Sequence, residues 1–273
     1  MMGEAKRRET FSQRTRREQP RCIFCAGEAP SETVEHYPPR ILFEGKQRPQ
    51  GLEFGACKAC NEGSREADLI VALLSRMMPD PKTEAGRKDV SRLIKQVLRI
   101  PGFADEVRPV DDQLGTLLRY KDIVAALPSW HFMKIDGPIV AKAMTVFATK
   151  LGMAMHTATT GRIIPQGGTL EVQWFSNLQA YEGKLPKEFL NVCGPGKTLR
   201  QGSFDVADQF RVASAISPDE TFSGHFAIFR DSFAALMFAQ EQPDERSKEQ
   251  DKGWVLSPGF LKRPLNVRPI RQA

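Results

Sequence analysis

Two cysteine pairs are the residues of this 273-residue sequence whose types and spacing point most clearly to chemistry. Cys22 and Cys25 form one C-x-x-C pair, and Cys57 and Cys60 form the other. Zinc takes four ligands at the corners of a tetrahedron, and a two-residue gap lets both thiolates of a pair face one ion. The doubled C-x-x-C therefore predicts a structural four-cysteine zinc site, rather than redox chemistry or a chance spacing.

A second group of polar residues lies beside these cysteines. Glu35 and His36 fall between the two pairs, and Asn61 directly follows the last cysteine. Zinc binding would bring these segments together. Oxygen ligands suit Mg2+ or Mn2+, and an imidazole near its ordinary pKa can accept a proton from water at neutral pH. A divalent ion with a general base could hydrolyse a phosphodiester. The alternative is that His36 is a structural residue paired with its neighbour Glu35, or a bystander.

The order C-x-x-C, Glu-His, C-x-x-C-Asn and then a helix resembles the zinc-binding branch of the HNH, or His-Me finger, endonucleases. The resemblance covers about residues 21–78. It implies a ββα-metal finger, in which a β-hairpin carries Glu35 and His36 and a helix begins near Asn61. His36 would be the general base, and Glu35 would help to hold the catalytic Mg2+ or Mn2+. Asn61 would bind that ion or orient the base, and the four cysteines would hold only the structural zinc.

The sequence departs from this pattern at the helix, where many family members have a second histidine and this chain has none. If the helix begins at Asn61, then Asn61, Arg65 and Asp68 share one helical face. Asp68 is then a candidate third ligand of the catalytic ion, with Glu66 as the other acidic candidate, and Arg65 could contact a phosphate. A helix that begins at Ser64 weakens this interpretation, and an exposed Arg65–Asp68 ion pair is the simpler alternative.

The charge distribution suggests a polyanionic partner. The chain has 39 basic and 33 acidic residues, a net charge of +6, and residues 1–21 hold seven basic side chains against three acidic ones. A flexible or partly helical basic arm over residues 1–20 is typical of nucleic-acid binding, although a merely solvated terminus has the same composition. The candidate phosphate contacts are Arg7 and Arg8 in the arm and Arg40 and Arg65 beyond it.

The elements that must position these residues are predicted from hydrophobic periodicity. Apolar residues recur at helical spacing over residues 69–77 and 90–98, and a wide apolar stripe over 139–155, interrupted by Lys142 and Lys150, predicts a buried helix. Strands are expected in four later segments: 170–174, 210–216, 225–229 and 233–238. The histidines His131, His156 and His225 have no ligand-like spacing and are expected to be structural.

These patterns predict an α+β protein of three parts: a basic arm (1–20), a zinc-braced ββα-metal (HNH) finger (21–80) and a larger α+β domain of unknown role (81–273) with a surface tail of about thirty residues. The leading hypothesis is a metal-dependent HNH endonuclease acting on nucleic acid, with DNA favoured by the resemblance alone. The main alternative is a catalytically silent zinc module that binds nucleic acid or protein. Activity in the C-terminal domain is a third hypothesis, and that domain could also bind a partner or form a homodimer. No secretory signal or membrane span is evident, so a cytoplasmic location is expected.

Overall fold

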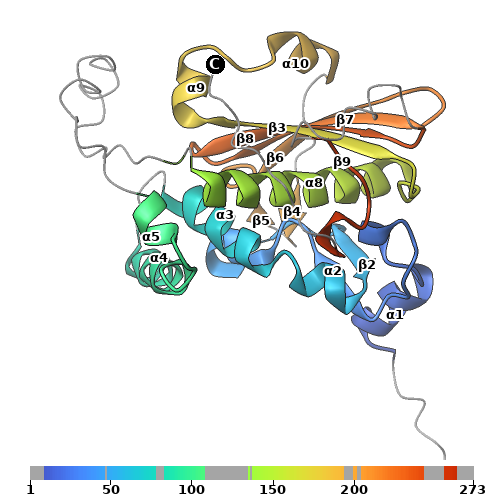
Figure 1. Ribbon diagram of the computed structural model, residues 1–273, viewed down its shortest axis with the longest axis horizontal. Helices are drawn as coiled ribbons and strands as arrows, with labels where there is room; N and C mark the ends of the chain where they lie inside the picture. Colours follow the sequence, from blue (N-terminus) through green and yellow to red (C-terminus); the bar gives the residue numbers. More distant parts are fainter. Residues whose placement is uncertain are drawn as a thin grey trace, which may run out of the picture.

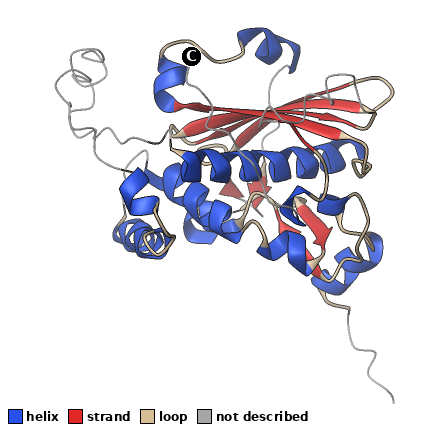
Figure 2. Ribbon diagram, in the orientation of Figure 1, coloured by secondary structure: helices blue, strands red, loops and turns tan. Residues whose placement is uncertain are grey.

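The computed structural model describes residues 9–46, 48–77, 83–107, 135, 137–193, 199–201, 204–242 and 255–262. Its helices and strands are mixed, which confirms the α+β prediction. Figure 1 shows a sheet with helices on both faces, and the N-terminal elements lie beyond a long helix that covers the lower face. Figure 2 shows the same layers coloured by secondary structure.

The main sheet is antiparallel and has the strand order β6-β7-β8-β3-β9. All four predicted strand segments overlap its strands, and apolar residues are buried along their lengths. The bounds are β3 Thr169–Ser176, β6 Arg211–Ile216, β7 Phe222–Phe229, β8 Phe233–Gln240 and β9 Val255–Leu256. A separate short pair consists of β4 (Arg200–Gln201) and β5 (Phe204–Asp205). One sheet face is covered by α9 (Asn177–Tyr181) and α10 (Lys187–Cys193).

The other sheet face packs against α8, which spans Pro138–Thr160 and contains the predicted buried helix. Gly152 permits this close packing, because a Cβ there would lie 2.9 Å from the Leu170 side chain of β3. The opposite side of α8 contacts α3, so the helix is buried from two sides. Among the residues that the structure describes, no helix combines the length and apolar character needed to cross a membrane.

The N-terminal part consists of short elements below α8 (Figure 1). Its strands β1 (Thr33–His36) and β2 (Glu53–Ala56) pair antiparallel, with Thr33 opposite Ala56 and His36 opposite Glu53. The α-helices are α1 Phe11–Glu18, α2 Lys58–Glu62, α3 Arg65–Met77, α4 Glu84–Val97 and α5 Phe103–Glu106. The 3-10 helices are η1 Ile23–Cys25, η2 Arg40–Leu42 and η3 Glu44–Lys46, with η5 Phe260–Lys262 near the C-terminus. We call residues 21–62 the cysteine module.

Part of the predicted arm is a helix, which is one of the two states expected of it. Thr10 and Gln13 form a capping box at the start of α1, and the helix packs against β1 and β2. The Gln19 side chain accepts a hydrogen bond from the Gly55 backbone at 2.8 Å and donates one to the Glu53 carbonyl at 3.3 Å. Residues 9–20 are therefore attached to the hairpin. The rest of the arm, including Arg7 and Arg8, lies outside the described residues.

One continuous hydrophobic core joins the cysteine module to the rest of the protein. It runs from the buried cysteines through α3 and α8 to the main sheet. Residues 255–262, which were expected in the surface tail, contribute β9 at the sheet edge and η5 against α2. The Gly259 backbone N–H donates to the Phe24 carbonyl at 2.9 Å. The predicted finger and C-terminal domain thus share a core, because a hairpin and a short helix bury too little apolar surface by themselves.

Candidate metal centre

The four cysteines of the two C-x-x-C pairs meet at one point. Cys22 caps the start of η1 and Cys25 ends it. The next two residues, Ala26 (φ 53°) and Gly27 (φ 75°), are left-handed, and the Gly27 N–H donates to the Cys22 carbonyl at 3.0 Å. Cys57 caps the start of α2, and Cys60 lies within that helix. Their four sulfur atoms are buried and lie within 4.8 Å of one another. Thiolates around a tetrahedral zinc, with Zn–S near 2.3 Å, are about 3.8 Å apart, so the cluster fits a zinc ion.

Even without a metal ion, the contacts within the cluster favour the deprotonated form of Cys22. A hydrogen bond from the Cys60 thiol lowers the pKa of Cys22 to about 5, and the same bond raises the pKa of Cys60. Zinc requires deprotonated cysteines, so its binding would release the remaining protons. Cys193, the fifth cysteine, lies on α10 on the far side of the main sheet from α8.

The two residues predicted to act together next to this site project in opposite directions. Glu35 and His36 are consecutive in β1, and successive side chains of a strand point to opposite faces. Glu35 points into the protein and is only 7% exposed, whereas the His36 side chain is 33% exposed. The strand thus separates the predicted metal ligand from the predicted base.

Glu35 forms an ion pair with a lysine from α8. The Lys150 ammonium lies 2.9 Å from Glu35 Oε1 and donates a second hydrogen bond to Ser64 Oγ at 2.7 Å. Ser64 in turn donates to Asp68 Oδ2 at 2.9 Å, and the Tyr37 hydroxyl donates to Asp68 Oδ1 at 3.1 Å. We call these five residues the Lys150 network. Its two carboxylates are thus held around one buried ammonium.

Burial dominates the electrostatics of this network. It raises the pKa of Glu35 and of Asp68, and the charge of Lys150 opposes both shifts. Burial also raises the pKa of Tyr37 well above its ordinary value, which keeps the phenol protonated as a donor. The ammonium lies 4.8 Å from the ring centres of both Phe24 and Tyr37. Cation–π attraction adds to the ion pair at this range.

Asn61 is bound to β1 and lies in a different helix from Asp68. Its Nδ2 donates to Thr33 Oγ1 at 3.0 Å. The predicted face of Asn61, Arg65 and Asp68 required one continuous helix, but α2 ends at Glu62 and α3 begins at Arg65. Asp68 is buried, whereas Arg65 is exposed, so the expected common face does not form.

These contacts bear on the catalytic ion that the resemblance implies. Each of its three predicted ligands already has a hydrogen-bond partner. Glu35 accepts from the Lys150 ammonium, and Asn61 donates to the Thr33 hydroxyl. Asp68 accepts from the hydroxyls of Ser64 and Tyr37. A divalent cation among them would have to coexist with a buried positive charge a hydrogen bond away from Glu35. The donor set therefore fits Mg2+ or Mn2+ poorly, in contrast to the fit of the cysteines for zinc.

His36 lies on the outer face of β1 within a small charged cluster. Arg48 donates a short hydrogen bond to His36 Nδ1 and another, at 2.8 Å, to Glu53 Oε1. Burial, followed by the charges of Arg48 and Arg40, lowers the pKa of His36, although Glu53 opposes the shift. The ring is therefore neutral at pH 7. With Nδ1 accepting from Arg48, its proton resides on Nε2, so the ring can accept another proton only if Arg48 moves away.

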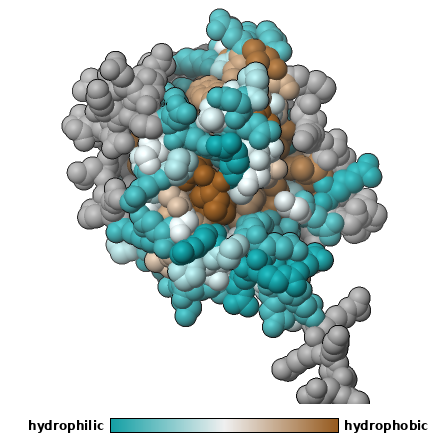
Figure 3. Space-filling model, turned by 90° about the vertical axis from the view of Figure 1, so that its right-hand side faces the viewer, coloured by the Kyte–Doolittle hydropathy of each residue, from teal (hydrophilic) through white to brown (hydrophobic). Residues whose placement is uncertain are grey.

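The remaining predicted phosphate contacts are exposed on the cysteine module and just after it. Arg40 lies in η2, and Arg65 begins α3. Lys58, at the start of α2, is exposed as well. None of these three cations forms an ion pair with a described residue. Figure 3 shows that the lower part of one face, on the side where α1 and the hairpin lie, is covered mainly by hydrophilic side chains.

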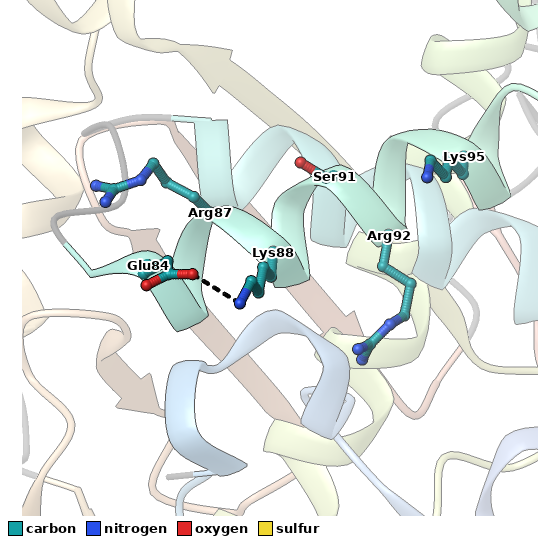
Figure 4. Close-up of a pocket in the computed structure, with 6 residues that line it drawn as sticks. All are labelled: Glu84, Arg87, Lys88, Ser91, Arg92 and Lys95. Carbon is teal, nitrogen blue, oxygen red and sulfur yellow. Dashed lines mark ion pairs between the residues drawn. The ribbon is translucent and has the colours of Figure 1, made fainter.

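A second basic surface, absent from the sequence-based predictions, lies on α4. Arg87, Lys88, Arg92 and Lys95 project from one side of this helix and, with Glu84 and Ser91, line a groove of about 380 Å³ (Figure 4). Lys88 is paired with Glu84 at 2.7 Å. The i, i+4 recurrence of basic residues was the available sequence signal.

Two of the histidines that were expected to be structural belong to one buried chain of hydrogen bonds. His156 Nδ1 and His225 Nε2 both bond Ser223 Oγ, at 2.8 and 2.9 Å, and His156 Nε2 contacts Glu241 Oε1 at 3.2 Å. His156, Ser223 and His225 are fully buried. The predicted structural role of both histidines agrees with this burial, while His131 lies outside the described residues.

Lys150 is the residue of the site that sequence reasoning missed. In the sequence, its charge interrupts an apolar stripe. A lysine is almost never fully buried unless it is paired, so its position inside a buried helix was itself a signal for an acidic partner. The partner could not be identified, because Glu35 is distant in sequence.

Comparison with known proteins yields no relative: no protein-family model, no curated protein and no solved structure matches the chain. The likeness to HNH endonucleases therefore rests on the residues and their order alone.

Proposed function

We propose that this protein binds nucleic acid through the exposed side of its cysteine module, and that one structural zinc stabilises that module. The observation that carries this proposal is the set of exposed cations, Arg40, Lys58 and Arg65, on or next to the fold that the four cysteines stabilise. Their positive charges have no acidic partner among the described residues. The net charge of +6 favours association with a polyanion in the same way.

The binding function is preferred to catalysis because each residue of the predicted active site has its own structural partner. Glu35 pairs with Lys150, His36 with Arg48, and Asn61 with Thr33. A module without catalytic activity is therefore consistent with the contacts of all three residues.

Phosphodiester hydrolysis remains the second candidate, and the neutral state of His36 favours it. In that case Arg48 would leave Nδ1 to bind a substrate phosphate, and His36 would then accept a proton from the attacking nucleophile. Incubation with supercoiled plasmid and with structured RNA tests this candidate, using His36→Ala as the control. Cleavage by the wild-type protein that the variant lacks would establish hydrolysis. Equal products from both proteins would remove His36 from any such reaction.

Binding itself is tested by fluorescence anisotropy with labelled duplex DNA and structured RNA across a salt series. The double variant Arg40→Glu/Arg65→Glu should bind more weakly than wild type. Each lost phosphate contact should also flatten the slope of log K against log salt by about 0.9 on B-DNA. The matched control is Lys187→Glu/Arg211→Glu, which makes the same charge change on α10 and β6. Equal losses in both variants would mean that only net charge matters, and would contradict a binding surface on this module.

A further inference from the structure

We propose that the Lys150 ammonium is a built-in cation that takes the place of a divalent ion beside the hairpin, so that no divalent ion binds between Glu35 and Asp68. The inference goes beyond nucleic-acid binding and does not depend on it. It concerns the two acidic residues, Glu35 and Asp68, that the sequence suggests as ligands of a second metal.

The ammonium has the position and partners of a bound cation. It contacts Glu35 Oε1 directly and reaches Asp68 through the hydroxyl of Ser64. The hydrogen bonds have a consistent direction, since Lys150 donates to Ser64 and Ser64 donates to Asp68. Both carboxylates therefore face one positive charge, as they would around a shared metal ion.

The surroundings leave no opening for a second cation. The Lys150 side chain is 0% exposed, and Glu35 and Asp68 are 7% and 9% exposed. The rings of Phe24 and Tyr37 flank the ammonium, and Tyr37 is itself fully buried. A divalent ion would have to displace a charge that is already desolvated and paired. Removing one partner of such a pair leaves an uncompensated buried charge.

The lysine also makes the cysteine module depend on the rest of the chain. Glu35 lies in β1, and Lys150 comes from the middle of α8. Ser64 directly precedes α3, and Asp68 lies in its first turn. A metal ion that links β1 to α3 would have to be taken up from solution. Lys150 supplies the linking positive charge as part of the core helix α8. The centre of the module is thus completed by a residue from the sequence region that was predicted to be a separate domain.

Electron paramagnetic resonance of Mn2+ added to the zinc-loaded, full-length protein tests the proposal. Mn2+ prefers oxygen ligands and should leave the four-cysteine site to zinc. We expect the wild-type protein to leave added Mn2+ free. The variant Lys150→Met, which removes the ammonium and keeps both carboxylates, should bind Mn2+ in the range of weak oxygen-ligand sites, roughly 10⁻⁴–10⁻³ M. The double variant Lys150→Met/Glu35→Gln should lose that binding.

Two results would overturn the proposal. Saturable Mn2+ binding by the wild-type protein that Glu35→Gln abolishes would show that a metal ion and Lys150 coexist. A folded Lys150→Met protein that binds no Mn2+ would show that the ammonium does not stand in a latent cation site. If Lys150→Met does not fold, the comparison of wild type with Glu35→Gln decides alone, because it needs no lysine variant.

Discussion

Removing the Lys150 ammonium should destabilise the whole fold, not only the cysteine module. The residue is fully buried and bonds Glu35 and Ser64. Breaking a buried ion pair by deleting one partner typically costs about 3–5 kcal/mol, because the other charge is left without compensation. That is a large part of the total stability of a domain, about 5–15 kcal/mol. We therefore expect Lys150→Met to lower the free energy of unfolding by about 3–5 kcal/mol in urea denaturation at pH 7 with zinc present.

A double-mutant cycle separates the charge effect from the loss of packing. Glu35→Gln in the Lys150→Met background removes the uncompensated carboxylate, so the double variant should be more stable than the sum of the two single losses predicts. The pH dependence has a definite sign. Without Lys150 the folded-state pKa of Glu35 rises further above its unfolded value, so the folded state gains a proton. The penalty of Lys150→Met should then shrink as the pH falls from 7 towards 5.

Additive single losses in that cycle would refute the reasoning. So would a cost below about 1 kcal/mol for Lys150→Met, since that is the range of exposed pairs.

Three other variants test separate parts of the structure. The Cys57→Ser variant should contain no zinc, as measured by elemental analysis, and its cysteine module should be unfolded, as measured by circular dichroism. The control variant Cys193→Ser should keep both the zinc and the folded module. Zinc retained in Cys57→Ser would contradict the four-cysteine site. Gly55→Ala places a Cβ 2.2 Å from Ser31 Oγ and should cost about 1–3 kcal/mol in urea denaturation, against little for Gly167→Ala, where the space is open. Burial lowers the pKa of His225 to about 3, so the unfolded state binds its proton first and stability is lost as the pH falls below 6.5. From pH 7 to 5, His225→Gln should therefore lose about 2 kcal/mol less stability than wild type, and equal losses would contradict the shift.

The sequence predicted best what depends on neighbouring residues. The C-x-x-C pairs identified the four-cysteine cluster, because two residues between cysteines suffice to turn both toward one point. The apolar stripe over residues 139–155 likewise identified the helix α8. These features need no information about distant contacts.

Two features were encoded locally, and one of them was missed. The alternation of a β-strand already implies that Glu35 and His36 face opposite ways. The resemblance assigned both residues to one site in spite of this alternation. The second feature is the Thr10–Gln13 capping box, which accounts for the helix in the arm, one of the two states expected there.

The Lys150 network could not be predicted in the same way, because it is assembled from three distant segments. The sequence shows a lysine in a buried helix, but only the packing of α8 against α3 and η1 selects its partners. The shared core is unpredictable for the same reason. A boundary near residue 80 follows from composition, whereas the contacts that cross it depend on tertiary structure.

The most direct test of the account measures nucleic-acid binding while zinc is removed. The full-length protein would be titrated with a zinc chelator, and both zinc content and anisotropy of a labelled duplex would be followed. We predict that binding falls in proportion to the zinc lost, and that added zinc restores it while Mg2+ does not. Binding that persists unchanged in zinc-free protein would contradict the claim that the zinc-stabilised module is the nucleic-acid-binding surface.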